Sequence, residues 1–381
     1  MTGSIVQGHE RRAFILVPSD RSGGAERVQK IVALDLLARG WQVDIACLSE
    51  GIRAVFAPLA SERCTVTMLS RTRELHGVAG MFRLAFGTLR KRNYDLYFSS
   101  HTHCNAFLSF LRLMRLIRTD RLVARESTVV GRRFKGFTRL FYKTCYLFYG
   151  AIDMVVCQTE EMRRLLPAFA PLLDSKRLVT VPNPAPRANV ERRDAPLRDP
   201  IELVAVGRLI PEKGVSVLLE SVRRLHATGQ RVRLRVYGDG PLRAELEGLA
   251  SSLGLESVVR FEGVTTEALA RMSDADVCVV SSITEGFPNT LLEMMQANVR
   301  VVSTLCADGI DAIDGLVTCP VADAQALAEA IQAVIAGPTE GRARLFDEEL
   351  AKRDPRAFVD RLLHGPAKGG VLDLKESLDR P

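Results

Sequence analysis

The stretch ELVAVGRLIPEKGVSVLLESVRRLHA, residues 202–227, predicts a strand, a loop bounded by glycines and a helix, in that order. ELVAVG is apolar and rich in valine, which is typical of a buried strand, whereas the apolar residues of 215–227 recur with the helical period. The same signals alternate further along the chain. We expect strands at 233–238, 258–263, 276–282 and 300–304, and helices at 241–253, 266–272, 290–297 and 323–336.

A similar alternation occupies the first half of the chain. AFILVPS, residues 13–19, predicts a first strand, and AERVQKIVALDLLARG predicts a helix that ends at Gly40. Buried strands that alternate with helices are typical of βαβ units. The expected fold class is therefore α/β, with two doubly wound parallel-sheet (Rossmann-like) domains facing across a cleft. Further strands of the first domain are expected at 43–48, 65–69, 95–99, 122–126 and 154–158.

A proline-rich segment separates the two series. Residues 181–200 contain five prolines and no apolar period, which is typical of a linker. We therefore expect an N-terminal domain at 1–183, a linker at 184–200 and a C-terminal domain at 201–353. Residues 354–381 contain a helix signal, RAFVDRLLHG, that could return to the first domain, and a tail that is expected to fray.

Composition excludes several classes of protein. With 381 residues, of which 47% are hydrophobic and 25% charged, the chain has the composition of a globular protein of two domains. Its longest stretch without Asp, Glu, Lys or Arg covers 16 residues, 96–111, and a spanning helix needs about 20. The segment MTGSIVQGHERR has no apolar region before a cleavage site, so we expect a cytoplasmic protein.

The eight cysteines have no metal-binding spacing. No two of them lie within four residues of each other, which disfavours a zinc site. Most have apolar neighbours, as in MVVCQT at 154–159. We expect small buried side chains in a reducing compartment.

The net charge of +7 conceals an asymmetry along the chain. Residues 1–200 carry 32 basic against 18 acidic residues, and residues 201–381 carry 20 against 27. The basic excess is concentrated in 71–143, with 16 basic and 4 acidic residues. A basic domain favours an anionic partner. Nucleic acid, an acidic membrane surface and a phosphorylated substrate are all compatible with the charge alone.

Two loops that follow the first strands of the two series could bind phosphate. In VGRLIPEKG, Arg208 and Lys213 lie five residues apart on one strand-to-helix loop and could converge on one anion. In SDRSGGAER, Gly23 and Gly24 would let backbone N–H groups approach a phosphate or a sugar. The alternatives are two solvated cations and an ordinary glycine turn.

A third glycine segment, YGDGPLR at 237–243, resembles half of a dinucleotide-binding fingerprint. It has no third glycine, and its proline suits the first position of a helix. We therefore interpret it as a structural turn.

The strongest functional signal is SSITEGFPNTLLEMMQA, residues 281–297. It predicts a strand end, a loop and a helix that opens near Asn289 or Thr290, with Glu285 on the loop and Glu293 in the helix. Two carboxylates that face one cleft can each bind a pair of sugar hydroxyls. The helix N-terminus offers free N–H groups and a positive dipole end to a phosphate. The alternative is a helix-start carboxylate and a surface glutamate.

Much of the chain resembles the family-4 retaining glycosyltransferases, which have the GT-B fold. Their nucleotide-binding half is matched by GRLIPEKG, YGDGPLRAELEGLASSLGL, VRFEGV and EGFPNTLLE, in this order and at these spacings. EGFPNTLLE resembles their E-x7-E motif. SGGAERV resembles their first glycine loop, and DLYFSSHTHCNAFL followed by LVARES resembles their acceptor-side strands. The resemblance covers roughly residues 13–340 and is more specific in the second half.

This resemblance implies roles for residues of the second half. Arg208 and Lys213 would bind the donor diphosphate and stabilise the departing nucleoside diphosphate. Glu285 would contact the transferred sugar, and Glu293 would bind the ribose hydroxyls. Backbone groups would bind sugar hydroxyls and phosphate at Phe287, Pro288, Asn289, Thr290 and Leu291.

The resemblance also implies that Val264 lies near the base and that Gly23 and Gly24 approach the donor from the first domain. The family needs no metal for catalysis. Asp274 and Asp276 fit a DxD pattern, but they lead into a predicted strand rather than leaving one. We therefore expect neither a metal nor a cofactor.

The acceptor side departs from the family pattern. Many members have a histidine five residues after the aspartate of the strand that precedes the cleft, and counted from Asp95 that position is Ser100. His101 and His103 are out of register with it. His103 with Asn105 instead resembles the H-x-N pattern of relatives that extend lipid-linked glycans, which makes His103 a candidate catalytic residue.

The basic half is expected to contact a membrane. In FLRLMRLIR, Arg112, Arg115 and Arg118 recur every three residues among apolar ones, which predicts the basic face of an interfacial helix. RRFKGFTRLFYK, residues 132–143, is a second candidate. The alternative is a core helix with a solvated basic stripe. No RNA-binding motif is present, so we expect no nucleic-acid partner.

Together these inferences predict a glycosyltransferase that is peripheral on the inner, cytoplasmic face of the cell membrane. Its C-terminal domain would bind a nucleotide diphosphate sugar, with a UDP-sugar expected. It would move a hexose or N-acetylhexosamine, with retention, to an anionic lipid-linked or surface-glycan acceptor on the N-terminal domain, as in polysaccharide or lipopolysaccharide biosynthesis. Two alternatives stay open: a sugar-nucleotide epimerase of the same fold, and a non-catalytic sugar-nucleotide-binding membrane scaffold.

Overall fold

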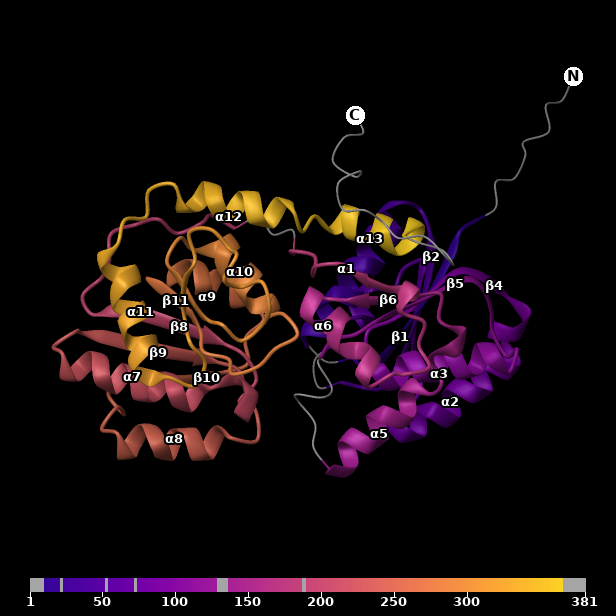
Figure 1. Cartoon of the computed structure of the whole chain (residues 1–381), viewed down its shortest axis with the longest axis horizontal. Helices are drawn as coiled ribbons and strands as arrows, with labels where there is room; N and C mark the ends of the chain where they lie inside the picture. Colours follow the sequence, from indigo (N-terminus) through magenta and orange to yellow (C-terminus); the bar gives the residue numbers. More distant parts are fainter. Residues whose placement is uncertain are drawn as a thin grey trace, which may run out of the picture. The chain divides into compact units, whose positions relative to one another are not determined.

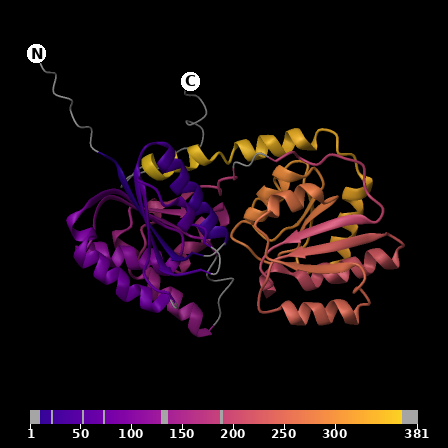
Figure 2. The same ribbon diagram turned by 180° about the vertical axis from the view of Figure 1, so that it is seen from behind.

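The chain forms two compact units in the computed structural model (Figures 1 and 2). One unit comprises Met1–Pro184 and Pro355–Pro381, and the other comprises Ala185–Asp354. The structure describes residues 10–20, 23–51, 54–71, 74–128, 136–186 and 190–365.

The first unit contains a parallel sheet with helices on both faces. Within the described residues its seven strands follow the order β3-β2-β1-β4-β5-β6-β7. The strands are β1 (Arg12–Ser19), β2 (Gln42–Ser49), β3 (Cys64–Met68), β4 (Asn93–Ser99), β5 (Arg118–Arg125), β6 (Met154–Cys157) and β7 (Leu178–Thr180). The helices are α1 (Gly24–Ala38), α2 (Glu74–Gly87), α3 (Thr102–Leu113), α5 (Gly136–Tyr146), α6 (Glu160–Leu165) and α13 (Pro355–His364). Short 3-10 helices lie at Ala57–Leu59, Leu89–Lys91, Tyr149–Ala151, Leu166–Ala168 and Ser175–Arg177.

Alternate side chains of β1 enter two different cores, because successive residues of a strand point to opposite faces of the sheet. Ile15 packs with α1 and α13 on one face, and Phe14 packs with α2, α3 and α5 on the other. The chain therefore returns through α13 to the first unit, where this helix packs against α1.

The second unit repeats this architecture with a parallel sheet of six strands among the described residues, in the order β10-β9-β8-β11-β12-β13. Its strands are β8 (Ile201–Val206), β9 (Val232–Tyr237), β10 (Val259–Gly263), β11 (Val277–Val280), β12 (Val301–Thr304) and β13 (Val317–Cys319). Its helices are α7 (Val215–Ala227), α8 (Arg243–Ser252), α9 (Ala268–Asp274), α10 (Asn289–Ala297), α11 (Ala324–Ala336) and α12 (Arg342–Ala351), with a 3-10 helix at Pro211–Lys213. Helices α7, α8 and α11 cover one face of the sheet, and α9, α10 and α12 cover the other. The prediction of two doubly wound parallel sheets is confirmed.

The predicted basic interfacial helix over FLRLMRLIR is wrong. Helix α3 ends at Leu113, Arg115 has a positive φ of 56°, and Arg118 is the first residue of β5, so the three arginines do not share a helix. Arg112 instead bonds within the unit, where Nη1 lies 2.5 Å from a carboxylate oxygen of Asp153. Of the second candidate, 132–135 lie outside the described residues and the rest forms part of α5.

All eight cysteines are buried and none forms a disulfide, so the expectation of buried thiols is confirmed. Burial, together with a smaller contribution from the nearby Asp44 carboxylate, raises the pKa of Cys64 to about 11. The Cys64 thiol is therefore protonated at neutral pH, and the buried cysteines act as small apolar side chains.

The proline-rich segment is attached to the second unit in its described part. Asp276, fully buried at the start of β11, accepts hydrogen bonds from Arg193 Nη2 at 2.7 Å, Arg198 Nε at 3.0 Å and the backbone N–H of Glu202 at 2.8 Å. Burial by itself would raise the pKa of Asp276, but these donors lower it below the ordinary value of 3.8. Asp276 thus has a structural role.

We predict that Asp276→Asn destabilises the protein by about 3 kcal/mol at neutral pH, because Arg193 loses its charged partner. A lowered folded-state pKa means that this stabilisation exists above the unfolded-state pKa and is lost as the pH falls through the folded-state value. Thermal unfolding should therefore show a difference between wild type and variant that shrinks below about pH 4. Asp274→Asn, at an exposed surface pair, is the control and should change little. A pH-independent difference would contradict this assignment.

Candidate active site

The carboxyl ends of β8 and β11 meet at the switch point of the second sheet. β9 and β10 lie on one side of β8, whereas β11 to β13 lie on the other. Because the loops that leave β8 and β11 diverge there, a ligand can bind between them. The loop after β8 carries Arg208 and Lys213, and the loop after β11 carries Glu285.

A glycine allows these two loops to touch. Gly214 has φ 60°, and a Cβ at this position would lie 2.2 Å from the backbone oxygen of Ser281. The loops also exchange hydrogen bonds, from Ser281 Oγ to the oxygen of Lys213 at 3.0 Å and from the N–H of Ile283 to the oxygen of Glu212 at 2.8 Å. The backbone around Lys213 is therefore fixed relative to the end of β11.

The YGDGPLR segment has a similar constraint. Gly238 has φ 144°, and a Cβ there would lie 1.7 Å from the backbone oxygen of Gly207. This close approach between the ends of β8 and β9 supports the interpretation of the segment as a structural turn.

Lys213 and Glu285 form an ion pair at this site. Lys213 Nζ donates to Glu285 Oε1, and Ser282 Oγ donates to the same oxygen at 2.9 Å. Both side chains are about one-fifth exposed, at 21% and 19%. The backbone N–H of Glu285 donates to the oxygen of Cys306 at 2.9 Å, which holds the loop at the end of β12. Two residues separated by 72 positions in the sequence, both predicted functional, are thus in contact.

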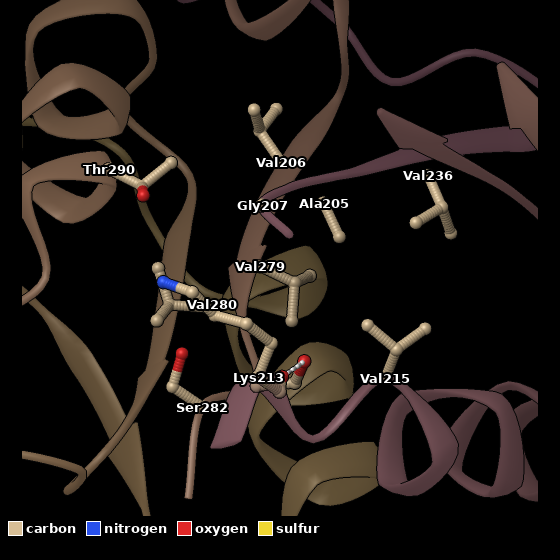
Figure 3. Close-up of a pocket in the computed structure, with 11 residues that line it drawn as sticks. Ala205, Val206, Gly207, Lys213, Val215, Val236, Val279, Val280, Ser282 and Thr290 are labelled. Carbon is tan, nitrogen blue, oxygen red and sulfur yellow. Dashed lines mark hydrogen bonds between the residues drawn. The ribbon is translucent and has the colours of Figure 1, made fainter. Parts of the chain in front are cut away.

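A small pocket opens beside this pair (Figure 3). Its apolar base comes from the strands, with Ala205, Val236 and Val279 among the lining residues, and its polar side from Lys213 and Thr290. The Lys213 side chain extends toward the side of the pocket where Ser282 and Thr290 lie (Figure 3). The pocket therefore combines the Lys213 ammonium group and the Thr290 hydroxyl with an apolar base.

Helix α10 begins beside the pocket at Asn289, after Pro288. The first N–H groups of a helix lack intrahelical partners and form its positive dipole end. Glu293, in the same helix, is buried, as are the side chains of Phe287 and Leu291. At Phe287 and Leu291, only backbone groups are therefore available to a ligand.

Two other predicted residues of this unit have exposed side chains. Arg208 forms no ion pair with another described residue. Val264 is 44% exposed just beyond the edge strand β10, and it is not among the residues that line the pocket.

In the first unit, Glu26, which follows the glycine loop, contacts one of the two histidines. Gly23 precedes α1, and a Cβ on Gly23 would lie 2.3 Å from Glu26 Oε2, so glycine leaves room for this carboxylate. Glu26 Oε1 lies 3.5 Å from Nε2 of His101, at the start of α3. His103 follows in the first turn of α3, where burial lowers its pKa below the ordinary value of 6.5. The Glu26–His101 contact had no separate signal in the sequence.

A second feature that the sequence did not indicate is a buried glutamate behind these histidines. Glu126, at the end of β5, is fully buried and accepts hydrogen bonds from four side chains. The donors are Thr102 Oγ1 at 2.8 Å, Asn105 Nδ2 at 3.2 Å, Tyr146 OH at 3.1 Å and Tyr149 OH. Burial raises the pKa of Glu126, and these donors oppose the shift. Asn105, half of the H-x-N pattern, therefore belongs to the core network that holds the start of α3.

Among the described residues, no group of three or more His, Cys, Asp or Glu side chains is arranged to hold a metal ion.

Two family models match successive parts of the chain. Residues 22–188 match "Glycosyltransferase Family 4", and residues 200–337 match "Glycosyl transferases group 1". The boundary between the matches falls close to the boundary between the two structural units.

Curated relatives match part of the chain. An uncharacterized glycosyltransferase of Methanocaldococcus jannaschii is 24% identical over 58% of the chain and 58% of its own length. The putative colanic acid biosynthesis glycosyltransferase WcaL of Salmonella typhimurium is 32% identical over 43% of the chain and 46% of its own length. The lipopolysaccharide core biosynthesis glycosyltransferase LpsE of Rhizobium meliloti is 30% identical over 51% of the chain and 57% of its own length. The chain thus spans about half the length of these relatives.

Solved structures resemble most of the chain. HepE of Anabaena, crystallised in complex with UDP-glucose, superposes with a TM-score of 0.75 at 15% identity and covers 92% of this chain and 98% of its own. WaaG, described as a glycosyltransferase involved in lipopolysaccharide biosynthesis, gives a TM-score of 0.65 at 17% identity, with coverages of 93% and 100%. At these identities the likeness is one of fold.

We predict that Gly214→Ala is more damaging than the same change at Gly229, another glycine of this unit with positive φ. Gly229 has φ 81° and open space around its Cα, so alanine there meets only backbone strain of about 1–2 kcal/mol. At Gly214 the added methyl group must also displace Ser281. Denaturant unfolding of both variants measures the difference, and equal losses of stability would show that the loop contact is not tight.

Proposed function

We propose that the chain is a family-4 glycosyltransferase of GT-B fold, because two glycosyltransferase family models match it in sequence order and its fold resembles that of HepE. From this premise we propose that it transfers a hexose or N-acetylhexosamine from a nucleotide diphosphate sugar, with a UDP-sugar as the expected donor. The acceptor is a lipid-linked or surface glycan, and the transfer retains anomeric configuration. The observation that carries the proposal is the Lys213–Glu285 pair beside the start of α10.

The charges at this site suit a nucleotide sugar. Lys213 and the N-terminus of α10 supply positive potential for a diphosphate, and the exposed Arg208 can swing toward it. Glu285 would accept hydrogen bonds from sugar hydroxyls. Ser282 Oγ donates to Glu285 Oε1, so this carboxylate keeps a hydrogen-bond donor when Lys213 moves to bind the phosphate. Glu293, on α10, is proposed for the ribose. Gly23, Gly24 and Val264 remain proposals for contacts with the far side of the donor and with its base.

The proposed reaction breaks the bond between the anomeric carbon and the diphosphate oxygen. The acceptor hydroxyl oxygen forms the new bond on the same face of the sugar, and its proton passes to the leaving phosphate oxygen. Negative charge develops on the diphosphate, so a pre-oriented cation at Lys213 lowers the barrier. His103, beside the buried Glu126 network, is proposed to face the acceptor.

Relatives support the assignment to envelope glycans. Their names include colanic acid and lipopolysaccharide core biosynthesis, and HepE was crystallised with UDP-glucose. A nucleotide sugar is an intracellular substrate and a lipid-linked glycan is a membrane one, so we propose a peripheral position on the cytoplasmic face of the membrane.

Helix α5 is the proposed membrane contact. Its side chains Phe137, Leu140 and Phe141 are 83%, 56% and 49% exposed, and Arg139 and Lys143 lie among them. The sequence from 127 to 152 contains no Asp or Glu. An exposed apolar stripe with only basic charges suits an anionic lipid surface. No helix in the described part of the chain is long and apolar enough to cross a bilayer.

We predict that Lys213→Ala reduces release of nucleoside diphosphate from the active sugar nucleotide by at least about 100-fold, because the leaving group loses its cation. The test incubates wild type and variant with a panel of UDP-, GDP- and ADP-sugars without acceptor and measures the slow hydrolysis. Arg223→Ala, which removes an exposed cation of the same unit, is the control. Unchanged hydrolysis in Lys213→Ala would overturn the site assignment. An epimerised sugar among the products would indicate an epimerase. Binding of a sugar nucleotide without any turnover would indicate a scaffold.

We predict that the double variant Phe137→Ser, Phe141→Ser binds vesicles of phosphatidylglycerol and phosphatidylcholine about tenfold more weakly than wild type, since two apolar anchors are lost. Co-sedimentation measures the binding. Leu172→Ser removes another exposed apolar side chain of the first unit, outside α5, and should have no effect. Equal binding by the double variant and wild type would refute the contact through α5.

A further inference from the structure

Arg353 lies where the chain leaves the second unit. That unit spans Ala185–Asp354, so the chain passes between units once before Ala185 and once after Asp354. The backbone oxygen of Arg353 accepts a hydrogen bond of 2.8 Å from the N–H of Ala185. The two crossover segments are thus joined to each other at the edge of the second unit.

The side chain of Arg353 reaches the loop that is proposed to bind the donor. Its guanidinium carbon lies 4.2 Å from the centre of the Phe287 ring, and its Nε donates to Glu349 Oε1 at 2.8 Å. Both Arg353 and Phe287 are buried, and a cation–π contact that is shielded from water is stronger than an exposed one. Phe287 lies between Glu285 and Glu293, so one side chain connects the second crossover with this loop.

The first crossover is attached to the C-terminal end of α10, the helix whose start borders the site. Gln296, in α10, donates from Nε2 to the oxygen of Pro186 at 2.7 Å. Arg192 donates from Nε to the oxygen of Met295 in α10 at 2.8 Å and from Nη2 to Asp347 in α12 at 2.8 Å. Helix α12, which leads to Arg353, packs on α10. Both crossovers are therefore bonded to the loop and helix of the donor site.

We propose that Arg353 is a positioning residue that couples the donor-binding loop at Phe287 to the two crossovers. A ligand shifts a conformational equilibrium only if it binds one state more tightly than the other. Because the loop and the crossovers share Arg353, a donor that selects one loop position also selects one arrangement of the crossovers. The role in turnover rests on the proposed function, whereas the coupling itself does not need a donor.

The test measures amide hydrogen exchange at Ala185 in the ligand-free protein. Phe287→Leu removes the aromatic ring that Arg353 contacts. It should speed exchange at Ala185 about tenfold, because Arg353, whose backbone oxygen accepts the hydrogen bond from the Ala185 N–H, loses its buried cation–π contact. Arg353→Met, which keeps an apolar side chain and removes the cation, should do the same. Arg344→Met is the matched control: it removes an exposed cation of α12 that pairs with Glu348 on the surface, and it should change exchange at Ala185 by less than about twofold.

A second arm adds the active sugar nucleotide. In wild type we expect protection of both the 285–291 loop and Ala185, and in Arg353→Met protection of the loop alone, with kcat reduced about tenfold and donor KM changed less. Arg353→Lys, which retains the charge, should recover part of both effects. Exchange at Ala185 that is unchanged by Phe287→Leu would overturn the coupling. If no sugar nucleotide protects the loop, the proposed function fails, and the ligand-free arm still decides the coupling.

Discussion

The ion pair between Lys213 and Glu285 is the interaction on which the candidate site depends. It joins the loop after β8 to the loop after β11, at the point where the strand order of the second sheet reverses. Such a pair can form only because Gly214 lets the two backbones touch. The pair also compensates the charges of a partly buried cation and a partly buried carboxylate. Packing, backbone conformation and electrostatics therefore converge on one pair of loops.

Local arrangement, and not overall charge, determines what each half can bind. The second half has more acidic than basic residues, yet its switch point presents Lys213, the exposed Arg208 and a helix N-terminus. The basic first half uses some of its cations internally, as Arg112 does with Asp153, and exposes others on α5 beside phenylalanine side chains. A residue count cannot separate paired cations from free ones, because pairing depends on contacts between distant segments.

The buried carboxylates Asp276 and Glu126, one in each unit, have hydrogen-bond donors of different charge. Asp276 is surrounded by guanidinium groups, which lower its pKa and anchor the proline-rich segment. Glu126 has only neutral donors among its hydrogen-bond partners, so burial raises its pKa, and it organises the start of α3 near His101 and His103. Neither carboxylate is among the residues that line the pocket beside Lys213.

The sequence alone determined the architecture and the main motifs. Regular alternation of apolar strands and helices predicted both sheets, because burial on two faces demands that pattern. The sequence pattern missed β7 and β13, because edge strands of three residues are too short to show a period. It also missed α12, because Phe346 is the main buried side chain of this helix. It wrongly joined Arg112, Arg115 and Arg118 into one helix, because a three-residue spacing cannot reveal a chain reversal at Leu113. Only the tertiary structure decided that Lys213 meets Glu285, that Asn105 belongs to the core and that Arg353 contacts Phe287. Each of these contacts joins segments distant in sequence, and the folded chain alone fixes their distances.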